Sequence, residues 1–414
     1  MGDFCVVGAG QAGLELAHGL RARGHGVTVY SAQHADEIRA GRPTSTQIMW
    51  GPARAAEREL GLALWDDEAP RITRLRFTVA AGGEPALDWT GLLTDEAISV
   101  DQRIKAPELM DRLDGEAMVI HPVTAKELDA LHAEFDGVIV STGKGDLGRI
   151  FPTNTDLTVH TGPPRHLSVI YLRDVCLGDD AETARFTLIP GVGEFIFMPT
   201  LSLDGPCLSV LIEAVPGGSL DRFGPWAGGP GRAVEPEDHL TALREIVDAH
   251  LPWMRSHFAK AIPSDDRANL VGRFTPTVRH PVATLPGGGS VVGLGDAVMV
   301  NDPISAQGAN VAALSSAHFV GEIDSRCVPG KRFGTEDWHG VTEGLHDRLQ
   351  VAVDFTNAFL NPLPPHFGQV LDLAGRHQPT ADRLANEFAD PTRIGWAFDP
   401  VTAGEYVEGV NAQL

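Results

Sequence analysis

The stretch FCVVGAGQAGLELAHGLRARGHGVTVY, residues 4–30, decides the fold of this chain. An apolar run at residues 4–7 predicts a strand, and the turn that follows holds Gly8, Gly10 and Gly13. Apolar residues then recur at helical spacing, and residues 27–30 predict a second strand. The stretch therefore predicts a strand, a tight turn, a helix and a parallel strand, within about 30 residues.

Each glycine of this turn has a physical task when the ligand is a dinucleotide. Gly8 allows the tight turn, Gly10 lets the backbone approach a pyrophosphate, and Gly13 lets the helix pack close to the strand. The diphosphate then lies at the positive end of the helix, beside Gln11 and Ala12. A glycine turn without a ligand is the alternative.

The end of the second strand departs from the usual dinucleotide pattern. An acidic residue normally holds the ribose hydroxyls there, but this chain has Ser31. A serine hydroxyl binds a ribose less strongly than a carboxylate does. The substitution weakens the case for tightly held NAD and is neutral for loosely held FAD.

A second motif lies almost 300 residues further along the chain. The apolar run at residues 290–294 predicts a strand that ends in Gly295 and Asp296, and Pro303 and Gly308 precede a helix. Asp296 can bind ribitol or ribose hydroxyls, and a helix start can stabilise negative charge on a reduced flavin ring. One cofactor held from both ends of the chain fits FAD better than NAD. An ordinary turn before a capped helix is the alternative.

The composition describes an acidic globular chain. Its 414 residues are 43% apolar and 21% charged, with 33 Lys and Arg against 55 Asp and Glu and a formal charge of −22. Nucleic acids and anionic membranes attract clustered basic residues, so the charge argues against both partners. No apolar stretch approaches the roughly 18 residues of a membrane span, and no signal peptide opens the chain. We therefore expect a cytoplasmic protein.

Common patterns for side-chain catalysis and metal binding are lacking in the sequence. The four cysteines form no C-x-x-C pair, and there is no G-x-S-x-G, no H-E-x-x-H and no cluster of metal ligands. We expect no bound metal. These absences fit a reaction that an organic cofactor carries.

The middle and the end of the chain change character. Between residues 145 and 220, short apolar runs separated by Pro and Gly predict strands of a mainly antiparallel sheet. Residues 239–250 and most of residues 351–414 predict helices. We interpret the sheet as a layer that covers the substrate.

These motifs together resemble the oxygenase component of styrene and indole monooxygenases, the two-component FAD-dependent epoxidases. The resemblance covers most of the chain, and it rests on residues 7–14, 141–144, 199–202, 293–296, 302–303, 307–310 and 363–365. It implies an α/β fold: a Rossmann-like FAD-binding domain of the aromatic-hydroxylase type, an inserted, mainly antiparallel β substrate domain and a helical C-terminus. The implied boundaries are 1–144 plus 265–330 for the FAD domain, 145–264 for the substrate domain, and 331–414 for a helical segment packed on the FAD domain.

The resemblance also implies a reaction. Reduced FAD from a separate NADH-dependent flavin reductase and O2 would form a C4a-hydroperoxyflavin, which epoxidises a small aromatic alkene such as styrene or indole. Single-component aromatic hydroxylases carry an additional Asp-Gly motif for NAD(P)H, and the corresponding segment from Pro163 to Val169 lacks it. The later Asp204-Gly205 predicts a hairpin turn instead.

The family pattern carries roles over to particular residues of this chain. The implied catalytic positions are Gln47, Pro303, Gly308 and Asn310. Met49 and Met198 are implied walls of the substrate pocket. The implied FAD contacts are Gly8, Gly10, Gln11, Ala12, Gly13, Ser31, Arg103, Val123, Thr142, Gly143, Asp296, Pro303, Gly308, Ala309 and Asn310. The family usually has an asparagine where this chain has Gln47, which leaves the substrate preference open.

Three other functions remain as alternatives at this point. One is a self-sufficient NAD(P)H-dependent aromatic hydroxylase, and another is a biosynthetic epoxidase that acts on a different alkene. The third is a non-catalytic protein that keeps the nucleotide fold to bind a partner. The helical C-terminus also allows a homodimer contact.

Overall fold

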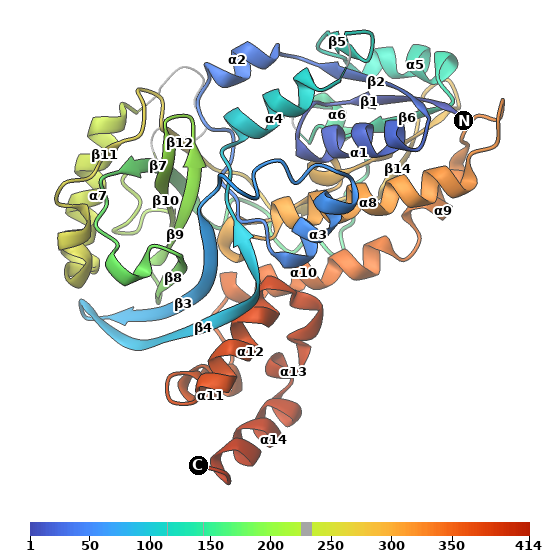
Figure 1. Cartoon of the computed structure of the whole chain (residues 1–414). Coiled ribbons are helices and arrows are strands. Elements are labelled where there is room, and N and C mark those ends of the chain that lie inside the picture. Colours follow the sequence, from blue (N-terminus) through green and yellow to red (C-terminus); the bar gives the residue numbers. More distant parts are fainter. Residues whose placement is uncertain (114, 144, 225–233) are drawn as a thin grey trace.

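The computed structural model describes residues 1–113, 115–143, 145–224 and 234–414 (Figure 1). Lys144, part of one of the motifs above, lies outside the described residues. The chain forms a parallel sheet with helices on both faces, a larger mainly antiparallel sheet and a helical C-terminal segment. This is the predicted fold class.

The nucleotide-binding turn lies at the centre of a six-stranded sheet. Its strand order is β14-β15-β6-β1-β2-β5, and its pairings are parallel except that of β14 with β15. Phe4 and Val6 pack on one face of the sheet, whereas Cys5 and Val7 pack on the other. A strand covered on both faces needs apolar residues throughout, which explains the continuous run. The strands are β1 (Asp3–Val7), β2 (Gly26–Ser31), β5 (Met118–Ile120), β6 (Gly137–Val140), β14 (Val282–Thr284) and β15 (Ser290–Gly293).

Helices α1 (Gln11–Ala22), α4 (Gln102–Asp111) and α8 (Gly308–Arg326) pack together on one face of this sheet. Gly19 allows α1 and α8 to approach closely, because a Cβ at this position would lie 2.4 Å from a Val320 methyl carbon. The close approach brings the starts of α1 and α8 together. The other short helices of this half are α2 (Ala35–Arg39), α3 (Gly51–Glu59), α5 (Leu128–Glu134) and α6 (Asp146–Arg149).

The second sheet has eight strands, in the order β11-β7-β10-β9-β8-β3-β4, with β12 paired to β7. Its pairings are antiparallel except that of β3 with β8. Helix α7 (Pro236–His250) covers one face. The strands are β3 (Arg71–Ala81), β4 (Glu84–Ile98), β7 (His166–Arg173), β8 (Thr183–Ile189), β9 (Gly193–Ser202), β10 (Gly205–Ala214), β11 (Ile262–Pro263) and β12 (Asn269–Gly272).

The sheet topology corrects the predicted domain boundaries. Strands β3 and β4 belong to residues 1–144, and β12 belongs to 265–330, yet all three complete the antiparallel sheet. The pairing of β3 with β8 places Phe77 beside Phe186, more than 100 residues away. Local patterns predict strands but not their distant partners, so the boundaries could not be read from the sequence.

The C-terminal segment also packs differently from the prediction. Helices α9 and α10 contact α8 of the FAD-binding half, but α11 and α12 pack against β4 (Figure 1). Their aromatic side chains share a core with Phe77 and Trp89 of the antiparallel sheet. The burial of these rings explains the packing. The helices are α9 (Thr335–Thr342), α10 (Leu345–Leu360), α11 (Pro365–Ala374), α12 (Gln378–Ala389), α13 (Gly395–Phe398) and α14 (Pro400–Asn411).

Side chains of α12 also cover the free edge of β4. The Asn386 amide accepts from the Thr94 N–H and donates to the Leu92 carbonyl, both at 2.8 Å. Asp382 accepts from the Leu92 N–H at 2.8 Å. An edge strand with unpaired backbone groups can pair with other chains, and these bonds remove that hazard.

Candidate functional site

The glycine turn after β1 has the geometry that its sequence predicts. Gly8 has a φ of 122° and donates its N–H to the Tyr30 carbonyl at 2.9 Å. A Cβ on Gly13 would lie 2.1 Å from the Gly8 carbonyl oxygen, so only glycine permits this contact between α1 and the turn. The Ser141 hydroxyl, which sequence reasoning did not assign, donates to the same oxygen at 2.8 Å.

Gly10 differs from the other two glycines and gives the test of whether FAD fits. Its φ of −83° suits any residue, and a Cβ there would meet no atom of the described chain within 4 Å. The fold itself therefore does not require glycine at this position. An open space at the start of α1 is what a diphosphate needs, because the helix presents its free N–H groups there. The residues of the turn fit FAD.

The second motif lies beside the end of β6. Gly143 packs so closely that a Cβ would lie 2.2 Å from the Asp296 carbonyl oxygen. Asp296 is exposed in a 3-10 turn whose other two residues are buried, and Thr142 is half-buried. The structure thus brings together Thr142, Gly143 and Asp296, three residues predicted to contact FAD.

Two residues are predicted to contact the adenosine half of FAD. Ser31 ends β2, and Val123 follows β5. The Ser31 side chain is buried, and its hydroxyl donates to the Gln33 carbonyl at 2.7 Å. Val123 is partly buried against the core beneath β1 and β6. Their contacts with FAD stay predictions.

The segment before α8 presents a half-buried surface to the starts of α1 and α4. Pro303 opens a 3-10 turn, η5 (Pro303–Ser305), and Ala306 adopts a left-handed conformation with a φ of 52°. Pro303, Gly308 and Ala309 are half-buried, and a Cβ on Gly308 would meet no atom of the described chain within 4 Å. Gly308 therefore leaves open space at the start of α8.

Asn310 makes three hydrogen bonds through its side-chain amide. Its Oδ1 accepts from the Trp50 N–H at 2.8 Å, and its Nδ2 donates to the carbonyls of Ile48 and Ala306, both at 2.8 Å. These bonds use both amide hydrogens, and the contact of Asn310 with the isoalloxazine stays a prediction. Asn310 positions the segment that carries Gln47 and Met49.

Three glutamines meet between the two motifs, and we call Gln11, Gln47 and Gln102 the amide cluster. Gln102 donates to the Oε1 atoms of Gln47 and Gln11, and Gln11 donates to the Ala309 carbonyl at 3.2 Å. Gln47 is buried, and its Nε2 has no hydrogen-bond partner among the described residues. A buried amide donor without a partner is costly, so a bound group that accepts from it would be stabilised. Sequence reasoning missed Gln102, whose signal was its place in the first turn of a helix.

Both methionines predicted for the substrate pocket are buried. Met49 pairs with Ile98 through its backbone, and its sulfur accepts from Gln11 at 3.5 Å. The Met198 sulfur accepts from the Thr46 hydroxyl at 3.8 Å. These contacts place both sulfurs near the amide cluster or the segment before it, and the substrate role stays a prediction.

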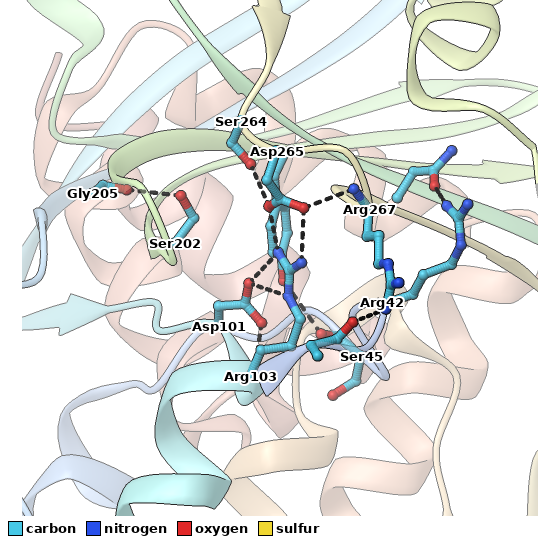
Figure 2. Close-up of polar contacts among 12 residues, drawn as sticks. Arg42, Ser45, Asp101, Arg103, Ser202, Gly205, Ser264, Asp265 and Arg267 are labelled. Carbon is cyan, nitrogen blue, oxygen red and sulfur yellow. Dashed lines mark hydrogen bonds and ion pairs between the residues drawn. The ribbon is translucent and has the colours of Figure 1, made fainter. Parts of the chain in front are cut away.

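Arg103 has partners other than the predicted diphosphate. Figure 2 shows its guanidinium between two carboxylates: Nε donates to Asp101 at 2.9 Å, and Nη1 and Nη2 donate to Asp265 at 3.0 and 2.9 Å. The arginine side chain is 1% exposed. Burial raises the pKa of Asp265, but the hydrogen bonds from Arg103, Arg267 and Ser264 and the charge of Arg103 together hold that pKa below its usual range. This ion-pair network instead fixes the start of α4 against the segment after β11.

The turn between β9 and β10 confirms the hairpin predicted at Asp204-Gly205. Gly205 pairs with Ser202 and has a φ of 98°.

In the described part of the chain, no helix has the length and apolar character needed to cross a bilayer.

Comparisons with known proteins show what the chain and its fold are similar to. Residues 143–257 match the family described as "Styrene monooxygenase A putative substrate binding domain". Styrene monooxygenase StyA of Pseudomonas fluorescens is 29% identical over 399 residues, which cover 94% of this chain and 93% of StyA. Two solved structures share the fold. A flavoprotein/dehydrogenase of Cytophaga hutchinsonii has a TM-score of 0.69 at 13% identity and covers 99% of both chains. Klebsiella pneumoniae HpxO, complexed with FAD and uric acid, has a TM-score of 0.59 at 13% identity and covers 97% of both chains.

The fold and the site define a flavin-dependent monooxygenase that uses FAD. Within this class the chain is similar to styrene monooxygenase StyA over 94% of its length, and residues 143–257 match the substrate-binding domain described for styrene monooxygenase A.

Proposed function

We propose that this enzyme epoxidises an electron-rich alkene attached to an aromatic ring, such as styrene or indole. It would use O2 and reduced FAD that a separate NADH-dependent flavin reductase supplies. The observation that carries the proposal is the meeting of the two FAD motifs, where Gln11 at the start of α1 donates to the Ala309 carbonyl at the start of α8. The likeness to StyA supports the choice of substrate.

Reduced FAD, when bound, supplies the electrons that activate O2, so that one oxygen atom enters the alkene and the other leaves as water. Gly8, Gly10 and Gly13 would hold its diphosphate at the start of α1. The adenosine half would lie along Ser31 and Val123.

The flavin half would lie between the second motif and the amide cluster. Asp296, with Thr142 and Gly143, would hold the ribitol hydroxyls. The half-buried surface of Pro303, Gly308 and Ala309 would face the ring, where the N–H groups at the start of α8 favour negative charge.

Chain residues around the ring would control access of water. The free Nε2 hydrogens of Gln47 would donate to a polar atom of the bound cofactor or of the oxygen being transferred. Met49 and Met198 would form apolar walls, because both are buried and neither introduces a charge. An apolar wall excludes water and admits an aromatic alkene.

We also propose a cytoplasmic location, where NADH and a reductase are present. All four cysteines are free thiols, which fits a reducing compartment.

A homodimer is part of the proposal as well, and gel filtration of the pure protein tests it.

The experiment is oxidation of indole or styrene by the pure protein with FAD and NADH. It is run with and without an unrelated flavin reductase, and catalase is present to remove free peroxide. We expect an epoxide-derived product only when the reductase is present. Product without the reductase would show a nicotinamide site in this chain and favour a self-sufficient hydroxylase. Failure to bind FAD would overturn the proposal.

A further inference from the structure

Four charged side chains gather beneath the turn that carries Pro303. Glu194 on β9 and Glu213 on β10 lie directly opposite each other in the strand register. Asp302 immediately precedes η5, and Arg165 precedes β7. Glu213 is 0% exposed, Asp302 1% and Glu194 5%. Three carboxyl groups therefore share one buried region with one guanidinium.

Arg165 is committed to one of the three acids. Its Nε and Nη2 donate to the two carboxylate oxygens of Glu194 at 2.8 and 2.9 Å, and its Nη1 donates to the Pro164 carbonyl at 3.0 Å. This bidentate pair satisfies Glu194. The guanidinium attracts the other two acids only through space.

Glu213 is left beside Asp302 without a cation of its own. Among the described residues, no N–H or O–H group of another residue reaches either carboxylate oxygen of Glu213. The Asp302 carboxyl is within hydrogen-bonding reach of it. Two buried carboxylates in contact repel each other strongly, whereas one shared proton converts the repulsion into a hydrogen bond.

We propose that Glu213 is a positioning residue, which shares a proton with Asp302 and thereby holds the turn of η5 where Pro303 faces the flavin. The proposal rests on the function proposed above. Asp302 transmits the effect, because its Oδ1 also accepts from the Ile304 N–H at 3.2 Å and so fixes the first turn of η5. Pro303 lies between these two anchored residues.

Burial and the neighbouring Asp302 support a neutral Glu213. Burial first, and then the charge of Asp302, raises the pKa of Glu213 well above its usual range. Burial also raises the pKa of Asp302, against the bonds from Glu213 and Ile304. The charged and titratable groups that face the pair are Glu194, Arg165 and His160.

A small hollow lies on the Asp302 side of the pair. Polar side chains line it beside Asp302, namely His160, Asn301, Thr356 and Asn357. Because Asp302 forms part of this lining, the shared proton can exchange although Glu213 itself is buried. The pair therefore responds to the pH of the medium.

The structure predicts the sign of this response. The folded protein keeps the proton up to a higher pH than the unfolded chain does, so stability and turn position are complete at low pH and decline as pH rises through the raised pKa. The affinity for FAD should decline over the same pH range, because Pro303 in this turn is proposed to face the flavin. The dissociation constant should rise at alkaline pH by up to about tenfold per pH unit, the limit for the loss of one proton.

The test compares FAD binding by the full chain, from about pH 6 to about pH 10, in the wild type, Glu213→Gln and Glu213→Leu. The glutamine amide donates to Asp302 but does not titrate, so Glu213→Gln should flatten the alkaline rise. Glu213→Leu should weaken binding by about tenfold or more at neutral pH, because it leaves Asp302 without its partner. An alkaline rise that is the same in Glu213→Gln and the wild type would overturn the proposal.

Infrared difference spectroscopy supplies a readout that needs neither activity nor flavin. The wild type minus Glu213→Gln difference should show the carbonyl stretching band of a protonated carboxyl group, and that band should disappear at alkaline pH. Glu15→Gln is the matched control, since Glu15 is another fully buried acid with a raised pKa but lies on α1. This control should lose a different band and keep the wild-type pH dependence of FAD binding.

The outcomes separate the two proposals. If the wild type binds no FAD at any pH, the proposed function fails, and the infrared band still reports on Glu213. If FAD binds and the band of a protonated Glu213 is absent at neutral pH, the positioning role fails and the proposed function stands.

Discussion

Asn310, in the first turn of α8, accepts a hydrogen bond at 2.8 Å from the backbone N–H of Trp50, which is 260 residues away in the chain. The same amide donates to the Ile48 carbonyl. These two bonds therefore fix the segment from Gln47 to Trp50 against the start of α8. One side chain thus connects the second FAD motif to the segment that carries Gln47 and Met49.

Asn310→Ala should destabilise the protein by about 2–4 kcal/mol, because it leaves the buried Trp50 N–H and Ile48 carbonyl unpaired at about 1–3 kcal/mol each. Urea unfolding measures the change. Asn361→Ala is the control: its amide makes an exposed bond to the Asn357 carbonyl, and its loss should cost less than about 0.5 kcal/mol. Equal costs for the two variants would contradict the anchoring role.

Gly10→Ala separates cofactor binding from folding. A Cβ at Gly10 meets no atom of the described chain, so the free energy of unfolding without FAD should change by less than about 1 kcal/mol. The same methyl group would occupy the space of the diphosphate, so the dissociation constant of FAD should rise by about tenfold or more. Gly321→Ala, at an exposed and equally open position on α8, should leave FAD affinity unchanged.

Gly13→Ala provides the opposite contrast, since its Cβ would lie 2.1 Å from the Gly8 carbonyl oxygen. This variant should lose stability even without FAD. A Gly10→Ala protein that binds FAD as the wild type does would refute the proposed position of the diphosphate beside Gly10.

Arg103→Met should be strongly destabilising, by about 3–5 kcal/mol, because it leaves the fully buried Asp101 carboxylate without a cation. The double variant Arg103→Met/Asp101→Asn removes that charge as well and should recover a large part of the loss. Chemical unfolding of both variants measures the difference. If the double variant is no more stable than the single one, the buried carboxylate is not the cause.

Glu15 should make stability depend on pH. Burial raises its pKa to about 8, although the charge of Lys105, whose Nζ lies 3.4 Å away, acts in the opposite direction. The unfolded chain releases this proton near pH 4.3, so the contribution of Glu15 is complete below about pH 4 and is lost as pH rises to about 8, by at most about 1.4 kcal/mol per pH unit.

Glu15→Gln removes this proton and should remove that part of the slope of stability against pH. The measurement is the free energy of unfolding from urea titrations between about pH 5 and about pH 9. Glu245→Gln, at an exposed position on α7, is the matched control and should keep the wild-type slope. A slope that survives in Glu15→Gln would assign the pH dependence to another group.

The local elements of the FAD-binding half were predictable because their signals are short-range. The strand, glycine turn and helix at residues 4–22 follow from backbone sterics and apolar spacing. The antiparallel strands β7 to β10 were predicted for the same reason. In contrast, β3 and β4 were not assigned, and the partner of β3 on its other side, β8, lies about 100 residues away, so no local pattern indicates that pairing.

The same distinction between short-range signals and long-range contacts applies to the candidate site. By itself, the sequence determined the dinucleotide turn and the Gly-Asp motif, because glycine at Gly8 and Gly13 is a steric requirement of the turn. Only the tertiary structure decided what the polar side chains do. Arg103 was predicted to contact the cofactor, but it binds Asp265, and Asn310 binds the backbone near Trp50. A hydrogen bond acts over about 3 Å, so its partner depends on which distant segments the folded core brings within that distance.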